Sequence, residues 1–156
     1  MPYIDMWVHL IWATKNRQPF INKAIKGLLI PHIRKNAISK DIHIDFLNCV
    51  QDHIHLLVSL RPNQDISGVV RLIKGESSHW INQQKLVKAN FRWQHDYIAI
   101  SISKSGISRV REYIKNQENN HRIKSFSEEY AEYIKKYGFR LRGLIRDNFN
   151  YFNPRA

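Results

Sequence analysis

Two histidines, His53 and His55, stand two residues apart in a stretch whose other residues as far as Leu60 are apolar, except Ser59. In a β-strand, successive side chains point to opposite faces, so both imidazoles would lie on one face and Ile54 and Leu56 on the other. Neighbouring imidazoles can share a divalent metal ion, which histidine binds through a neutral ring nitrogen. The alternative is a half-exposed or hydrogen-bonded pair without metal. The metal site is therefore a hypothesis that requires further ligands from elsewhere in the chain.

A tyrosine and a glutamine, Tyr113 and Gln117, stand one turn apart in a helix predicted over residues 107–122. At that spacing their side chains share one side of the helix. The glutamine oxygen can serve as a third metal ligand, with His121 as an alternative. A tyrosine beside a metal can attack phosphorus, displace the 3′-oxygen of a nucleic-acid strand and form a covalent phosphotyrosine. Free tyrosine has a pKa near 10, so a cation, a base or water must activate it. The alternative is that the tyrosine packs and the glutamine lies on the surface.

The charge of the chain indicates a polyanionic partner. Lysine and arginine total 25 against 13 acidic residues, which gives a net charge of +12 and a pI near 10.0. Nucleic acid is the commonest partner of such a chain. Lys15 and Arg17, in a basic turn after the first predicted strand, are candidate phosphate contacts, although a solvated turn is an equal alternative. A membrane surface fits less well, because no predicted helix combines a basic face with a strongly apolar one. The remaining alternative is a merely basic housekeeping domain.

The composition favours one globular domain in the cytoplasm. The 156 residues are 43% hydrophobic, which is enough for a sizeable core. Cys49 is the only cysteine, which excludes an intrachain disulfide and a Cys-x-x-Cys zinc site. The sequence shows no secretory signal and no apolar run of membrane-spanning length.

The order of the predicted elements indicates a ferredoxin-like α+β fold. Alternation predicts strands, and three- to four-residue spacing predicts helices that begin at the caps Asn22 and Asp65. The elements are strand 4–14, helix 22–39, strand 41–50, strand 52–60, helix 65–84 and strand 97–102. Pro31 predicts a kink or a broken start in the first helix. The β-α-β-β-α-β order predicts a four-stranded antiparallel sheet with both helices on one face. The two histidines would then point to the other face, near the helix that carries Tyr113.

Beyond this fold, the sequence predicts one more helix over residues 127–137, ended by Gly138. Its three tyrosines, Tyr130, Tyr133 and Tyr137, are predicted to be packing residues. The remainder of the chain is basic and aromatic without a clear period.

Five motifs occur in an order that resembles the single-tyrosine transposases of the IS200/IS605 family, a branch of the His-hydrophobic-His (HUH) endonucleases. They are His-Leu-Ile-Trp-Ala-Thr-Lys-Asn-Arg at 9–17, Asp-His-Ile-His-Leu-Leu-Val at 52–58, Leu-Ile-Lys at 72–74, Trp-Gln-His-Asp-Tyr at 93–97 and Tyr-Ile-Lys-Asn-Gln at 113–117. The resemblance spans roughly residues 3–139. It implies a catalytic domain over residues 1–139 and leaves residues 140–156 as a basic C-terminal tail of unknown role.

The resemblance implies a specific activity. Such enzymes are homodimers that cut and rejoin single-stranded DNA at the ends of an insertion sequence and recognise hairpins there. They use Mg²⁺ or Mn²⁺ and form a 5′-phosphotyrosine, and the tyrosine helix often reaches the histidines of the other subunit. Carried over, the metal ligands are His53, His55 and Gln117, and the nucleophile is Tyr113. Arg71 and Lys74 become weaker candidates for the DNA path.

Three other functions remain as alternatives. A non-catalytic ferredoxin-like protein can bind nucleic acid by stacking bases on its sheet. A domesticated relative can act on repeated chromosomal hairpins, or the chain can be a replication-type nickase, although glutamine at position 117 argues against the two-tyrosine form. A zinc hydrolase fits poorly, because the two histidines lack a nearby carboxylate pattern.

Overall fold

The computed structural model of the chain describes residues 2–119 and residue 128. The chain divides into two compact units, Met1–Lys115 and Asn116–Ala156. The predictions for the helix over 127–137, for His121, for the three later tyrosines and for a domain boundary at residue 139 lie outside the described residues.

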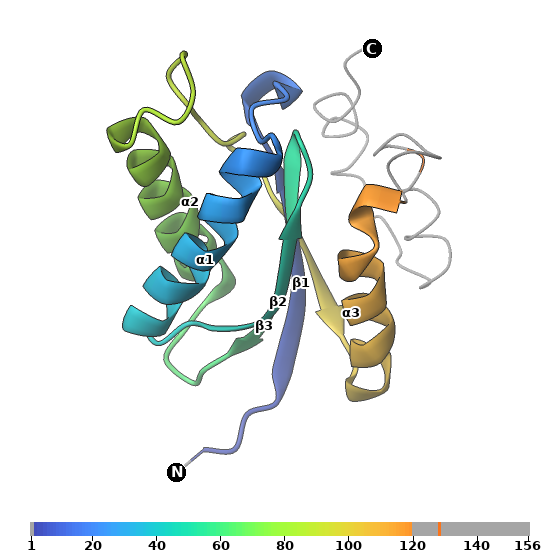
Figure 1. Cartoon of the computed structure of the whole chain (residues 1–156). Coiled ribbons are helices and arrows are strands. Elements are labelled where there is room, and N and C mark those ends of the chain that lie inside the picture. Colours follow the sequence, from blue (N-terminus) through green and yellow to red (C-terminus); the bar gives the residue numbers. More distant parts are fainter. Residues whose placement is uncertain (1, 120–127, 129–156) are drawn as a thin grey trace. The chain divides into compact units, whose positions relative to one another are not determined.

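The first unit is a four-stranded antiparallel sheet with helices on both faces (Figure 1). The strands are β1 (Met6–Ala13), β2 (His43–Cys49), β3 (His53–Leu60) and β4 (Ile98–Ile102), in the order β2-β3-β1-β4. Helices α1 (Lys23–Ser39) and α2 (Ile66–Gln83) cover one face, and α3 (Ile107–Lys115) covers the other. Short 3₁₀ turns, η1 (Lys15–Arg17) and η2 (Lys104–Gly106), follow β1 and β4. The predicted ferredoxin-like fold is confirmed.

Both predicted helix caps are present. Asn22 Oδ1 accepts a hydrogen bond from the Ile25 amide at 2.9 Å, and Asp65 Oδ1 accepts one from the Gly68 amide at 2.6 Å. Each bond satisfies an amide that the first helical turn leaves without a partner. Of the two outcomes predicted at Pro31, a kink or a broken start, the broken start is wrong, because α1 continues through the proline. Proline has no amide hydrogen to donate to the Gly27 carbonyl one turn earlier. Because Pro31 and Gly27 are both exposed, that carbonyl can accept a hydrogen bond from water instead.

The main core lies between the sheet and the pair α1 and α2. Alternate residues of β1 and β3 share this face and are buried there, including Leu10, Trp12 and Leu56. Ser77 stands within the buried stripe of α2, and its hydroxyl accepts a hydrogen bond from the Trp93 indole at 2.8 Å. That bond compensates for burying two polar groups in an apolar layer.

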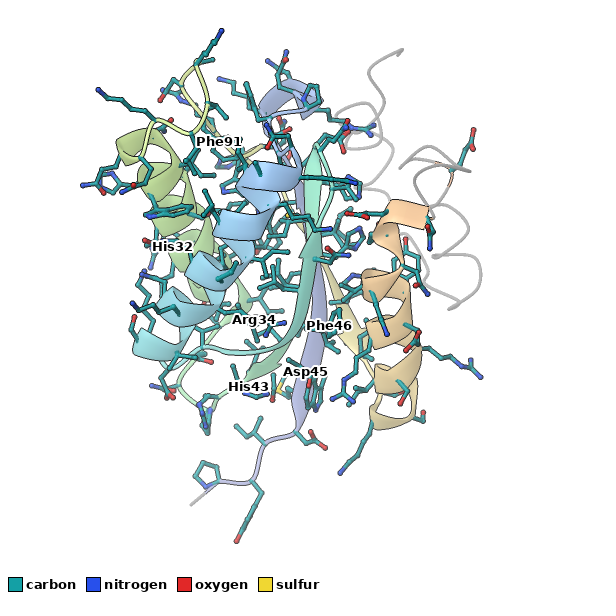
Figure 2. The ribbon with its side chains drawn as sticks, viewed as in Figure 1. His32, Arg34, His43, Asp45, Phe46 and Phe91 are labelled. Atoms are coloured by element: carbon teal, nitrogen blue, oxygen red, sulfur yellow. The ribbon has the colours of Figure 1, made fainter. Side chains whose placement is uncertain are left out.

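A smaller apolar cluster fixes α3 to the opposite face. It comprises the buried residues Leu57, Ile107, Val110 and Ile114. Figure 2 shows Asp45 and Phe46 of β2 on this side of the sheet, where Phe46 packs against the cluster and Asp45 forms an ion pair with Arg111 of α3 at 2.6 Å. The sheet face that carries the histidines is therefore covered by α3.

A buried amide holds the C-terminal end of α3. Asn48 of β2 donates from Nδ2 to the carbonyls of Ile114 at 2.8 Å and Lys115 at 3.4 Å, and its Oδ1 accepts from the Cys49 amide at 3.0 Å. These carbonyls belong to the last turn, where a helix has no internal donors for them. Asn48 thus fixes the segment that immediately follows Tyr113.

The helix predicted over residues 107–122 is shorter than expected. α3 ends at Lys115, Asn116 forms a turn, and residues 117–119 are helical again. The continuous spacing that placed Tyr113 and Gln117 on one side of a single helix is therefore interrupted between them. Over the described residues, no helix has the length and apolar character that crossing a membrane requires.

Replacement of Asn48 tests the attachment of α3. Asn48→Ala removes the donor for two carbonyls and is expected to lower the free energy of unfolding by about 1–3 kcal/mol. Hydrogen exchange should become faster in α3 than in β1 or β3. Denaturant unfolding and amide exchange measure the two effects. Arg111→Ala is the control, because it breaks an exposed ion pair on the same helix and should change stability much less. Equal losses in the two variants would contradict this role for Asn48.

Candidate active site

The two histidines lie side by side on β3, as the alternation predicts. His53 and His55 are both fully buried, and their ring centroids are 5.0 Å apart. Strand pairing places Ala13 of β1 opposite His53, and Ile11 of β1 and Asn48 of β2 opposite His55. Two imidazoles are thus brought together in the middle of a sheet, on the face that α3 covers.

An aspartate and an arginine orient His53. The Nδ1 atom of His53 lies 2.8 Å from Asp52 Oδ1. The other carboxylate oxygen, Oδ2, accepts from Arg17 at Nε (3.2 Å) and Nη2 (3.0 Å). Since an ionised carboxylate only accepts, this contact places a proton on His53 Nδ1 and makes Nε2 the nitrogen that can bind a metal.

The turn after β1 brings Arg17 to this position. The amide of Thr14 donates to the Asp52 carbonyl at 2.8 Å, and the Thr14 hydroxyl donates to the Gln18 carbonyl at 2.7 Å. The first bond connects the end of β1 to the β2–β3 connection, and the second lies within the turn that carries Arg17. Arg17, which was predicted to contact phosphate, therefore forms an ion pair with Asp52 within the site. Only 11% of its side chain is exposed.

A third histidine, His9 of β1, contacts the second member of the pair. Its Nε2 atom lies 3.0 Å from His55 Nδ1, and both rings are fully buried. Burial lowers the pKa of His9 to about 3, so the ring is neutral at physiological pH. The Nδ1 atom of His53 thus makes the hydrogen bond to a carboxylate that histidine metal ligands commonly make, whereas the Nδ1 atom of His55 is paired with another imidazole.

The donor set fits a divalent ion only in part. Two imidazoles with supported Nδ1 atoms suit a transition-metal site. Among the described residues, however, no three His, Cys, Asp or Glu side chains are grouped so that they could hold a metal. A metal at this pair therefore needs ligands of another kind. A carboxamide, water or a substrate phosphate can complete the coordination of Mg²⁺ or Mn²⁺.

Tyr113 lies beside His55 and His9. Its ring centroid is 5.6 Å from that of His55 and 6.0 Å from that of His9, in edge-to-face arrangements. It is partly buried at the margin of the α3 cluster, whereas its neighbour Ile114 is fully buried within that cluster. The structure thus brings together three of the four residues predicted for the chemistry, Tyr113, His53 and His55.

The fourth, Gln117, belongs to the second unit of the chain. Its side chain is buried. Its role as a metal ligand stays a prediction.

The remaining predicted DNA contacts differ in their environments. Lys15 and Arg71 are exposed. Lys74 instead donates from Nζ to the carbonyls of Gln94 (2.8 Å), His95 (2.8 Å) and Asp96 (3.1 Å). Its Nζ atom also lies 5.7 Å from the centroid of the Trp12 ring and 5.6 Å from that of the Tyr97 ring. Burial lowers the pKa of Lys74 to about 8, although Asp96 opposes the shift. Lys74 therefore holds the connection between α2 and β4.

Sequence reasoning did not assign a role to His9, Asp52 or Asn48. Asp52 directly precedes His53, so a carboxylate next to a candidate ligand was the available signal. His9 and Asn48 have no such local signal, because only the register of β1 and β2 against β3 brings them to the pair.

Comparisons with known proteins agree with this arrangement. The profile of the family described as "Transposase IS200 like" matches residues 3–117. The ISDra2 transposase TnpA of Deinococcus radiodurans is 27% identical over 115 residues, which are 70% of this chain and 81% of that protein. The transposase for insertion sequence element IS200 of Salmonella typhimurium is 26% identical over 114 residues, which cover 70% of this chain and 74% of the relative.

Two solved structures share the fold. A crystal structure of a Deinococcus radiodurans protein described as a transposase superposes with a TM-score of 0.61 at 25% identity, covering 75% of this chain and 95% of that one. A REP-associated tyrosine transposase bound to a REP hairpin gives a TM-score of 0.60 at 20% identity, covering 78% and 72%. With the family profile matching most of its length, the chain belongs to the IS200-like transposase family of the HUH superfamily.

Proposed function

We propose that this transposase cleaves and rejoins single-stranded DNA at the ends of an insertion sequence through a covalent 5′-phosphotyrosine at Tyr113. The observation that carries the proposal is the convergence of Tyr113 with His55, at 5.6 Å between ring centroids, on a sheet face where His53 lies alongside. The tyrosine and the candidate metal ligands come from separate elements, so their proximity is a product of the fold.

His53, His55 and Gln117 would hold the divalent ion, Mg²⁺ or Mn²⁺. When bound, such an ion supplies Lewis-acid polarisation of a phosphate oxygen and neutralises developing charge. Asp52 orients His53 and is itself held by Arg17. Supported ligands of this kind keep a site in its working geometry before substrate arrives.

Tyr113 would act as the nucleophile. Its phenolic oxygen forms a bond to phosphorus while the bond between phosphorus and the 3′-oxygen breaks. The phenolic proton is lost, and the departing 3′-oxygen gains one, so the cleaved strand ends in a 3′-hydroxyl. In the joining step, a 3′-hydroxyl attacks the phosphotyrosine and restores the phenol. No net hydrolysis occurs, so the energy of the phosphodiester bond is retained.

The DNA ligand is proposed to be single-stranded with hairpin ends, bound by a homodimer. The net charge of +12 supports a polyanionic ligand. One structural neighbour was solved with a REP hairpin, and at 20% identity that likeness is one of fold. Hairpin recognition and dimerisation rest on the family resemblance. Gel-shift titration with hairpin and scrambled strands, and molar mass by light scattering, test them.

Replacement of the nucleophile is the direct test. Tyr113→Phe removes the only atom that can form the phosphotyrosine and should abolish both cleavage and the covalent adduct with labelled single strands and Mn²⁺. Binding of the same strands should persist, because the ring and the basic surface remain. Tyr3→Phe is the matched control, since Tyr3 is fully exposed.

Each outcome of this test decides between functions. An adduct that survives in Tyr113→Phe would assign the chemistry to another residue. If the wild-type protein binds DNA but forms no adduct with either metal, a non-catalytic binding function replaces the proposed one.

Arg71 and Lys74 are expected to behave differently when each is changed to methionine. Arg71 is exposed, so Arg71→Met should leave the thermal midpoint unchanged, weaken DNA binding and reduce the salt dependence by about one phosphate contact. Lys74→Met should lower the thermal midpoint, because three carbonyls lose their donor. Thermal unfolding and fluorescence anisotropy at several salt concentrations separate the two. The reverse pattern would place Lys74 on the DNA path.

A further inference from the structure

The contact between His9 and His55 constrains where protons can sit. The Nε2 atom of His9 and the Nδ1 atom of His55 are 3.0 Å apart, in a place where both side chains are fully buried. At that distance one of the two nitrogens carries a proton and donates a hydrogen bond, and the other accepts that hydrogen bond. Two N–H groups would clash, and two bare nitrogens would repel each other through their lone pairs.

Only one of the two possible arrangements leaves His55 able to bind a metal through Nε2. A neutral imidazole has a single ring proton. If His9 donates, the proton of His55 must sit on Nε2, and that nitrogen has no lone pair to offer. If His55 donates from Nδ1, its Nε2 presents a lone pair, and the proton of His9 sits on Nδ1 of that ring.

We propose that His9 is a positioning residue that holds His55 in the Nδ1–H form, so that Nε2 of His55 faces the metal site as a ligand. The proposal rests on the proposed function of the histidine pair. It assigns to His9, on β1, the task that Asp52 performs for His53. The two supporting partners differ in chemistry. The carboxylate of Asp52 can only accept a hydrogen bond, whereas the imidazole of His9 can accept or donate one.

The surroundings of His9 support a fixed role. The ring stands on β1, whose register against β3 places His9 opposite Leu57 and one diagonal step from His55. The Tyr113 ring packs edge-on against it at 6.0 Å between centroids. His9 is thus held by backbone pairing on one side and by the candidate nucleophile on another, which leaves little room for the ring to turn away from His55.

The proton arrangement is measurable without metal or DNA. In the full chain labelled with ¹⁵N at histidine, long-range ¹H–¹⁵N correlation spectra distinguish the two neutral forms of each ring. We expect His55 in the Nδ1–H form, with His9 also protonated on Nδ1 and accepting at Nε2. A spectrum with His55 protonated on Nε2 would overturn the proposal, whatever the activity of the enzyme.

A pair of variants of equal chain length tests the acceptor itself. His9→Gln places an amide oxygen at the same number of bonds from the backbone as Nε2 and can accept from His55. His9→Met has a similar length and fills the space, but its thioether is a weak acceptor. We expect His9→Met to weaken Mn²⁺ binding by about 10- to 100-fold, the range found when such supporting partners are lost. His9→Gln should restore most of the affinity.

Mn²⁺ affinity is measured by calorimetry or electron paramagnetic resonance, with His43→Gln as the control for loss of an exposed histidine. If wild-type protein binds Mn²⁺ and His9→Met binds it equally well, the role of His9 is overturned while the proposed function stands. If wild-type protein and His43→Gln both fail to bind Mn²⁺, the metal site of the proposed function fails instead. Should His9→Met not fold, the spectrum of the wild-type chain decides alone.

Discussion

The pairing register of β3 with its two neighbouring strands is the constraint on which the site depends. It places His53 and His55 on the α3 face and sets His9, Asp52 and Asn48 around them. Because side chains alternate along a strand, a slip of one residue would turn the whole set toward α1 and α2 and bury polar groups in the apolar layer. The large core on that side penalises any other register, so packing on one face of the sheet determines the chemistry on the other.

The two faces of the sheet have different tasks. The face under α1 and α2 is almost wholly apolar and provides stability. The face under α3 is divided between an apolar cluster around Leu57 and the three histidines beside it. α3 spans this division, since its apolar residues dock on the cluster while Tyr113 lies at the margin next to His55. α3 therefore both covers this face of the sheet and positions the candidate nucleophile, Tyr113.

The parts of the fold that depend on local patterns could be predicted from the sequence. Alternation gave the strands, side-chain oxygens at Asn22 and Asp65 marked the helix starts, and the adjacent positions of His53 and His55 made the candidate ligands recognisable. The features that the sequence did not reveal depend on context that a single segment does not contain. The continuity of α1 through Pro31 depends on solvent exposure, and the engagement of Lys74 by three carbonyls depends on how the connection between α2 and β4 folds back. His9 is 44 positions before His53 in the sequence, and only strand pairing brings it to His55.

The turn that carries Arg17 has an energetic implication for the site. Asn16 and Arg17 are consecutive residues with left-handed backbone angles, φ of 57° and 53°. Asparagine tolerates this conformation, but arginine incurs a steric cost of about 1–2 kcal/mol. The two hydrogen bonds from its guanidinium to Asp52 offset that strain. A glycine at position 17 would relax the backbone and leave the carboxylate without its cation. Arginine at position 17 therefore strains the backbone but holds the Asp52 carboxylate in place. This single residue represents a trade-off between stability and activity.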